Sequence, residues 1–236
     1  MKQIYLKLLI ILSIILVIGL FFSFDLQQYL TLDYLKSRHT FYRQYYEQNQ
    51  LLSFGIYVIA LFLLTAFSIP GIIVVFLAGG ALFGFPVTLL ITSFTDALGS
   101  TAAFLASRYL FGNSIQAKYA ERLQIINNEA DKEWAFYLFS LRLMPFLPCF
   151  LINILMGVTT IPIMTFYLAT QVGKIPYIAI YINAGTQLGK IDSILGIFSP
   201  GIITSFVLIG LFPVISKKSL QWYRGRKKNR QVKKIK

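Results

Sequence analysis

Long apolar runs dominate this chain and restrict its fold more than any other feature. Residues 8–24, 51–69, 87–111, 162–182 and 196–216 are apolar and close to the roughly 20 residues that one membrane-spanning helix needs. Hydrophobic residues fill 56% of the 236 positions and charged residues only 13%, about half the share typical of soluble proteins. The sequence therefore predicts an all-α integral membrane protein with roughly five or six transmembrane helices in a single bundle.

The polar segments between these runs have patterns of their own. The first run ends without the small residues that a signal peptidase cleaves, so we interpret it as a retained span. Residues 25–50 are rich in aromatic residues at helical spacing, which predicts a helix at the membrane interface. An amphipathic surface helix is expected over residues 113–133, with Asn113 or Ser114 as its N-cap. The expected regions are 1–50 (first span and interfacial segment), 51–190 (core), 191–216 (last span) and 217–236 (basic tail).

The net charge of +13 is concentrated at the C-terminal end. Residues 217–236 contain ten Lys or Arg and no acid, so the rest of the chain holds only +3. This pattern indicates a cytoplasmic tail, and each basic residue near the surface adds about 1 kcal/mol of attraction to anionic lipid headgroups. We expect a multi-pass protein of the plasma membrane, and of the bacterial inner membrane from its compact length and Ile/Lys-rich composition. Membrane lipids are the expected partners, and nucleic acid is not.

The usual motifs of catalysis and metal binding are missing from the sequence. Cys149 is the only cysteine and His39 the only histidine, so they form neither an internal disulfide nor a zinc site. The chain has no Walker loop, no nucleophile elbow and no cluster of His, Asp and Glu. We expect no enzyme, no metal and no other cofactor. Cys149 lies in an apolar run and is expected to be buried.

Two apolar segments are broken by glycine and proline in a similar way. The breaks are 10 and 6 residues apart in the first segment and 9 and 5 residues apart in the second. Residues 72–85 are too few to cross a bilayer, so we expect a re-entrant helical hairpin in each segment, arranged as the inverted repeat of a transporter. If both are hairpins the N-terminus lies outside, whereas if one crosses both ends lie inside; both topologies remain open. The expected hairpin-breaking residues are Pro70, Gly80, Gly84, Pro86, Pro145, Pro148, Gly157 and Pro162.

Four charged residues lie inside apolar stretches: Asp96, Arg108, Arg142 and Lys174. Each costs about 2.5 to 3.5 kcal/mol at the centre of a spanning helix, so each must pair, face water or reach the interface. Arg108 is close enough to its helix end to extend to the interface, and an alternative role in the site stays open. Asp96 is about 18 Å along the helix axis from Arg108, so its expected partner is Arg142 or Lys174 from the other half.

The densest polar signal begins at Arg142 and continues through Pro145 and Pro148 to Asn153. Prolines free backbone carbonyls, which is tolerated at membrane depth only where protein or water covers them. The guanidinium of Arg142 offers a planar fork of donors that matches a phosphate. The block indicates an anion or phosphate-headgroup site, with the alternative that Arg142 satisfies carbonyls of its own hairpin. The candidate transport residues are Asp96, Arg108, Arg142, Lys174 and Asn153.

Glycine, proline and arginine recur in two blocks over about residues 65–190. They are Gly80, Phe83, Gly84, Gly99, Phe104, Arg108 and Gly112, then Arg142, Pro145, Pro148, Asn153, Gly157, Phe166, Gly173, Pro176 and Gly185. Through these residues the chain resembles the SNARE-associated Golgi protein family, also called the DedA or VTT-domain family. The resemblance implies two facing re-entrant hairpins and movement of phospholipid or lipid-linked phosphate across the bilayer. The acidic pair of one bacterial branch is absent, since residues 48–79 contain no Asp or Glu, so proton coupling would depend on Asp96.

The sequence thus favours a membrane transporter that translocates or scrambles phospholipid or lipid-linked phosphate. In this hypothesis Arg142, helped by Arg108 or Lys174, attracts the phosphate, and Asp96 balances these bases or takes up a proton. Two alternatives stay open. One is a small-ion or metabolite transporter, proton-coupled or not, and the other is a non-transporting membrane scaffold whose tail and surface helices bind partners.

Overall fold

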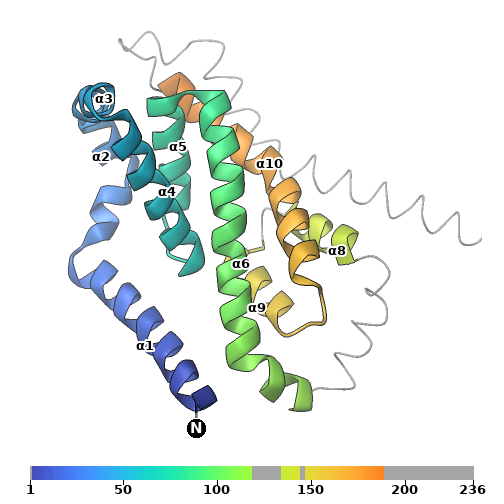
Figure 1. Cartoon of the computed structure of the whole chain (residues 1–236). Helices are drawn as coiled ribbons and strands as arrows, with labels where there is room; N and C mark the ends of the chain where they lie inside the picture. Colours follow the sequence, from blue (N-terminus) through green and yellow to red (C-terminus); the bar gives the residue numbers. More distant parts are fainter. Residues whose placement is uncertain (1, 119–133, 144–146, 189–236) are drawn as a thin grey trace, which may run out of the picture.

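The computed structural model describes residues 2–118, 134–143 and 147–188. In these ranges the chain consists of helices joined by turns, without strands (Figure 1). Two helices are long and apolar enough to cross a membrane, over Tyr5–Ser23 and Phe85–Gly112, and a third candidate arises if the bent pair Phe41–Gln48 and Gln50–Ala66 is one span. The all-helical membrane fold is confirmed for these residues. The count of roughly five or six spans stays a prediction, because residues 196–216 and the basic tail lie outside the described ranges.

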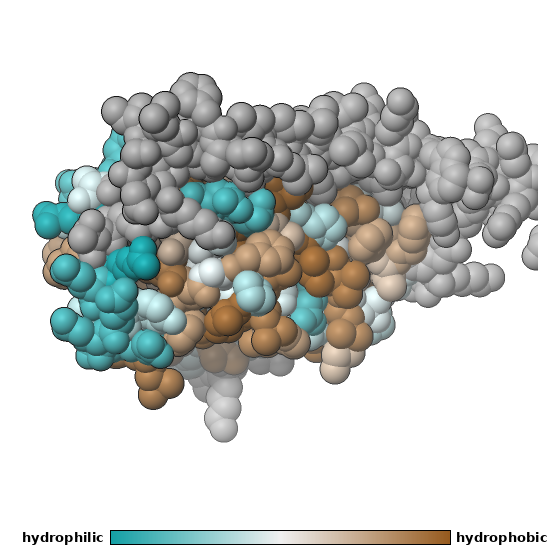
Figure 2. Space-filling view, turned by 90° about the horizontal axis from the view of Figure 1, so that it is seen from above, coloured by the Kyte–Doolittle hydropathy of each residue, from teal (hydrophilic) through white to brown (hydrophobic). Residues whose placement is uncertain are grey.

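The N-terminal run forms one helix, and the aromatic segment after it forms three short ones. Their bounds are Lys2–Ser23 for α1, Leu26–Leu30 for η1, Leu32–Ser37 for α2 and His39–Gln48 for α3. Aromatic rings pack against each other here, as Tyr29 does with Tyr34 and Phe41 with Tyr45. Figure 2 shows hydrophilic residues gathered at the left of this face, on the side where α2 and α3 lie, beside a hydrophobic surface. The helical aromatic segment expected from the sequence is therefore present.

The helices α4 (Gln50–Ala66) and α5 (Ile72–Phe83) run in opposite directions and form a hairpin (Figure 1). Its turn contains two positive φ angles, 57° at Ser68 and 104° at Gly71, and the second suits glycine because it has no β-carbon. The expected reversal inside residues 72–85 is wrong, since Ile72–Phe83 is one helix and the chain reverses before it. Pro70 lies in that turn, as expected for a hairpin-breaking residue.

The chain reverses a second time at Gly84, which has a φ of 77° and lies between α5 and α6 (Phe85–Lys118). Pro86 is the second residue of α6, where its missing N–H costs no helical hydrogen bond. The helix then continues without a break through Asn113 and Ser114. The expected helix start at these two residues is therefore wrong, because both extend α6. Residues 119–133 of the predicted surface helix lie outside the described ranges.

The second half repeats this order of helices: α8 covers Trp134–Arg142, α9 covers Cys149–Gly157 and α10 covers Ile163–Leu188. Pro148 is the N-cap of α9, and Pro162 directly precedes α10, so both lie at helix ends as expected. Pro145 lies outside the described residues. Cys149, expected to be buried, is exposed as the first residue of α9.

The end of α4 and the end of α8 each lie near the middle of a long helix. At the end of α4, the side chain of Thr65 would lie 2.8 Å from a β-carbon placed on Gly99 of α6. At the end of α8, the β-carbon of Arg142 would lie 2.9 Å from one placed on Gly173 of α10. Since Gly99 and Gly173 are near the centres of their helices, the breaks between α4 and α5 and after α8 lie at mid-helix depth.

Each short helix packs mainly on the long helix of the other half, α5 on α10 and α9 on α6. Glycine makes the first contact possible, because a β-carbon at Gly80 would collide with the backbone carbonyl of Ile182, and one at Gly185 with that of Leu77. Gly80 was expected to break a helix, but it lies inside α5 and serves close packing. Gly157 has a similar role where α9 meets α6, beside Ser107.

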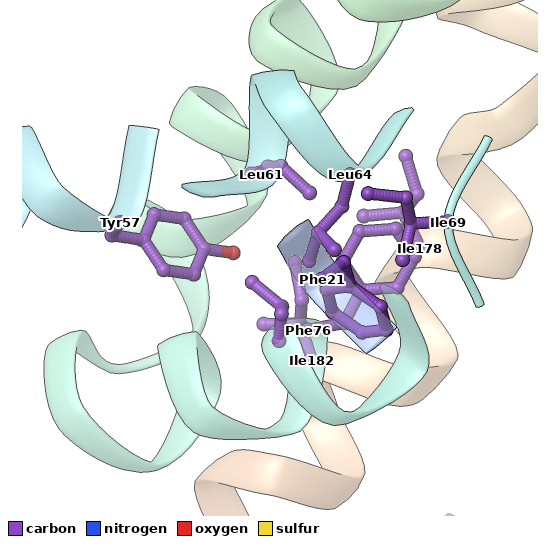
Figure 3. Packing of buried hydrophobic residues seen from close by; sticks show 9 residues of the cluster. Phe21, Tyr57, Leu61, Leu64, Ile69, Phe76, Ile178 and Ile182 are labelled. Atoms are coloured by element: carbon purple, nitrogen blue, oxygen red, sulfur yellow. The ribbon is translucent and has the colours of Figure 1, made fainter. Parts of the chain in front are cut away.

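Two clusters of buried apolar side chains join these helices. The first joins α1, α4, α5 and the C-terminal half of α10, and Figure 3 shows Phe76 and Ile182 among its converging side chains. The second joins α6, α8, α9 and the start of α10, and includes the stacked rings of Phe104 and Phe166, 4.1 Å apart. In lipid such packing stabilises mainly through van der Waals contact. Lys174 lies on α10 between the residues of the two clusters, so a charge is placed where the halves meet.

Candidate functional site

A row of polar side chains runs along α6. Thr88, Thr92, Asp96 and Ser100 are four residues apart, and none of them is exposed to solvent. Each lies about 40° further around the helix than the one before, so the row winds slowly around α6 and Ser100 is about 120° from Thr88. Arg108 lies about 30 Å along the axis from Thr88, close to the hydrocarbon thickness of a bilayer, but about 200° around the helix from it, so it points to the opposite side. We call Thr88, Thr92, Asp96 and Ser100 the polar stripe.

The first part of the polar stripe finds its partners in α4 and α5. Thr88 donates a hydrogen bond to a backbone carbonyl of α5 at 2.8 Å. The hydroxyl groups of Tyr57 and Thr92 share a hydrogen bond of 2.6 Å. Thr65, at the hairpin end, donates to the Asp96 carboxylate at 3.2 Å. The three contacts satisfy buried polar groups, so this part of the polar stripe costs little in the closed arrangement.

The centre of the polar stripe is an ion pair between the two halves. The Lys174 ammonium lies 2.5 Å from the Asp96 carboxylate and also donates to the Ser100 hydroxyl at 3.4 Å. The side chains of Lys174 and Asp96 are only 4% and 1% exposed. The expectation that Asp96 pairs with a base of the other half is confirmed, and of the two candidates the base is Lys174.

Arg142 lies fully inside the protein at the end of α8. One of its terminal nitrogens, Nη2, donates to Asn153 at 2.7 Å and to Thr170 at 3.1 Å, and Nε also donates to Thr170 at 3.3 Å. The guanidinium lies over the ring of Phe166, 5.3 Å from its centre. The residue is 6% exposed, and its other terminal nitrogen, Nη1, has no hydrogen-bond partner among the described residues. A buried cationic donor without an acceptor is costly, and an anion would remove that cost.

Arg108 satisfies the backbone carbonyls that follow α9. Its Nη2 donates to the carbonyls of Thr159 and Ile161, each at 2.8 Å, and Nε donates to that of Gly157 at 3.3 Å. Arg108 thus covers free carbonyls of a broken segment. The same role considered for Arg142 stays a prediction, because residues 144–146 of its segment lie outside the described ranges. Extension of Arg108 to the interface is wrong, because its hydrogen bonds direct its side chain at the other half.

The charges in this region do not cancel. One acid, Asp96, forms an ion pair with Lys174 and also interacts electrostatically with Arg142, which has no ion pair of its own among the described residues. Asp96, Lys174 and Arg142 together carry a net charge of +1, so one bound anionic group would neutralise the region. No cluster of three or more His, Cys, Asp or Glu side chains suited to a metal ion occurs in the described ranges.

The structure brings four of the predicted site residues into two groups, Asp96 with Lys174 and Arg142 with Asn153, and places Arg108 apart from both. The residues that the sequence interpretation missed are buried hydroxyl groups: Tyr57, Thr65, Thr88, Thr92, Ser100 and Thr170. A signal was present for those on α6, because polar residues at intervals of four in an apolar helix indicate one polar face. Thr65 and Thr170 gave none, since single threonines are common in apolar helices.

Comparisons with known proteins agree with this architecture. The VTT domain family matches residues 69–187. A transmembrane protein 41B of Danio rerio is 33% identical over 184 residues, 75% of this chain and 64% of that protein. A transmembrane protein 41 homolog of Caenorhabditis elegans is 30% identical and covers 71% and 70%, and one of Dictyostelium discoideum is 28% identical and covers 75% and 55%. The chain thus spans about two thirds or less of the first two relatives in length. No solved structure matches.

Proposed function

This chain belongs to the VTT-domain family, the SNARE-associated Golgi or DedA membrane proteins, and we propose that it moves phospholipid between the two leaflets of a bilayer. The substrate class is a lipid whose headgroup contains a phosphate. The headgroup passes beside Asp96 and Ser100, where the polar stripe faces Lys174 of α10, while the acyl chains stay in the surrounding lipid. The family resemblance of the sequence implies the same activity, and the proposal assigns it to the polar stripe and its neighbours.

One observation supports the proposal above all others: within the described ranges, Nη1 of the buried Arg142 has no hydrogen-bond partner. A spanning protein does not keep a desolvated cation without cause, because its burial is costly and intramembrane charges are usually functional. Asn153 and Thr170 occupy Nη2 and Nε, which fixes the guanidinium and leaves Nη1 for a ligand. A phosphate oxygen is the acceptor that such a donor binds best.

The ion pair of Asp96 and Lys174 is the proposed gate. The polar stripe is closed in this structure, since Thr88, Thr92, Asp96 and Ser100 have no exposed surface. A headgroup enters when α10 separates from α6, and the phosphate then replaces the Asp96 carboxylate beside Lys174. The arrangements with and without the ion pair are expected to differ little in free energy, because a buried ion pair contributes little net stability.

The proposed architecture is an inverted repeat of α4–α6 and α8–α10. Its support is the repeated order of helices, the placement of both breaks at mid-helix, and the packing of each short helix on the other half. In an inverted repeat the two breaks approach from opposite membrane faces and meet near the midplane. A rocking motion of the halves would then expose the polar stripe to each leaflet in turn.

The test is lipid movement in liposomes that contain the purified protein and a fluorescent phosphatidylcholine. Without lipid movement an added reductant bleaches only the outer leaflet, so wild-type protein is expected to allow bleaching of the inner leaflet as well. In Arg142→Gln the loss of a charged hydrogen bond, about 1.5 to 3 kcal/mol, slows transport roughly ten- to hundredfold. Arg43→Gln is the matched control, because Arg43 has a 60% exposed side chain on α3 and is expected to keep wild-type activity.

Two outcomes contradict the proposal. Wild-type liposomes that bleach no further than protein-free ones would exclude lipid movement, and flux of a soluble anion in the same liposomes would then favour a small-ion transporter. Equal rates for wild type, Arg142→Gln and Asp96→Asn would exclude the proposed site. The circular dichroism and melting temperature of each variant show that it is folded before its rate is compared.

A further inference from the structure

An apolar pocket lies apart from the polar stripe, between the short interfacial helices and the hairpin of α4 and α5. Its volume is about 450 Å³, and η1, α2 and α3 form one wall while α4 and α5 form the other. Among the side chains that the structure describes, no charged one lines it. The volume falls within the range of roughly 300 to 1,000 Å³ in which proteins bind small ligands. The pocket therefore has the size of a binding site and the chemistry of hydrocarbon.

The two walls differ in chemistry. On the hairpin side the lining includes Ile56, Ala60 and Ala78, which present only carbon. On the interfacial side it includes Tyr34 and Tyr42, whose rings are apolar but whose hydroxyl groups bind polar partners. A ligand that is apolar along its length and polar at one end matches this arrangement. Rings with polar tips also favour the headgroup level of a bilayer.

The size of the pocket selects among such ligands. A protein cavity of about 150 Å³ holds one benzene molecule of six carbons. A pocket of about 450 Å³ is three times larger, so it accommodates roughly eighteen carbons, the length of one acyl chain. Apolar cavities stay free of water, and in a bilayer the available filling is hydrocarbon from lipid. We propose that this pocket binds one acyl chain of a membrane phospholipid, with the headgroup at the tyrosines of the interfacial helices.

Tyr57 connects this pocket to the polar stripe. Its ring lines the pocket, and its hydroxyl group bonds to Thr92 on α6 at 2.6 Å. Phe83 closes the same side, packed against the rings of Tyr57, Phe54 and Tyr46. The bound lipid is thus separated from the polar stripe by a single aromatic side chain. Binding of this acyl chain does not require the proposed transport activity, because the residues that line the pocket belong to helices other than α6 and α10.

The experiment uses the full chain in lipid nanodiscs that contain a phosphatidylcholine with a photoactivatable diazirine near the end of one acyl chain. After illumination, labelled peptides are identified by mass spectrometry. Label is expected on residues of the pocket such as Val75 and Ala78, above the level found on the exposed residues Leu90 and Leu98 of α6. Label spread evenly over all lipid-facing helices, or absent from the pocket, would overturn the proposal.

A filled pocket provides the second arm. The double variant Ala60→Phe/Ala78→Phe places two rings inside the volume, so labelling of the buried Val75 is expected to fall roughly tenfold. Ala102→Phe is the matched control, because Ala102 is half-buried on α6 and does not line the pocket. Unchanged labelling in the double variant, or an equal loss in the control, contradicts the assignment. Lipid movement is measured separately. A protein that moves lipid but shows no labelling of the pocket would contradict the pocket proposal alone. A protein that is labelled in the pocket but moves no lipid would contradict the proposed function alone.

Discussion

The ion pair at the centre of the polar stripe yields the sharpest prediction of stability. Lys174→Met removes the ammonium and leaves the Asp96 carboxylate, 1% exposed, with only the Thr65 hydroxyl at 3.2 Å as a donor among the bonds described above. Removing one partner of a buried ion pair costs about 3 to 5 kcal/mol. Asp96→Asn removes the charge from the other side and leaves a buried ammonium, so a cost of similar size is expected.

The double variant Asp96→Asn/Lys174→Met should be more stable than either single variant. It contains no unpaired buried charge, and replacing a whole buried pair by neutral groups is often close to neutral in stability. For a chain of 236 residues each kcal/mol shifts the melting temperature by roughly 2 to 4 °C. The single variants are therefore expected to melt about 6 to 20 °C below wild type, and the double variant within about 5 °C of it.

Thermal unfolding of all four proteins in the same nanodiscs completes a double-mutant cycle. The control is Arg43→Met, which breaks the exposed ion pair of Arg43 with Glu47 and should change stability by less than about 1 kcal/mol. If the losses of the two single variants simply add in the double variant, Asp96 and Lys174 do not interact, and the reasoning about the gate is refuted.

Two further predictions concern packing and backbone coverage. Gly80→Ala should destabilise the folded protein by about 1 to 3 kcal/mol, because the added methyl group collides with the Ile182 carbonyl. Gly55→Ala is the control, because no atom lies within 4 Å of a β-carbon at Gly55. The melting temperatures of the two variants are compared with that of wild type. Arg108→Met should lower the free energy of unfolding by about 1 to 3 kcal/mol for each backbone carbonyl that loses its donor and finds no water. The amide hydrogen-exchange rate of residues 157–161 should then rise while that of α5 stays unchanged. An equal change of exchange rate in both regions would contradict the capping role.

The sequence was sufficient for the composition-driven part of the fold. Apolar runs predicted the helices, and the cost of a mid-helix charge predicted that Asp96 would find a base in the other half. Pro148, Pro162 and Gly84 lie at helix ends because a missing N–H or a positive φ has local consequences that do not depend on the rest of the structure.

The errors came from residues whose role depends on contacts far along the chain. Gly80 looked like a helix break, but its small size serves the crossing with α10, about 100 residues away in sequence. Arg108 looked like a residue that reaches the interface, because only the packing of α9 on α6 brings three free carbonyls to its guanidinium. The choice of Lys174 over Arg142 as the partner of Asp96 depended on the same packing of the two halves.

The most direct measurement of the central claim compares two fluorescent lipids in one liposome assay, a phosphatidylcholine and a neutral glycosylated lipid without phosphate. If Arg142 recognises phosphate, wild-type protein moves the phospholipid roughly tenfold faster or more, and Arg142→Gln removes that preference by slowing the phospholipid alone. Equal rates for the two lipids in wild type, with Arg142→Gln slowing both alike, would contradict the account.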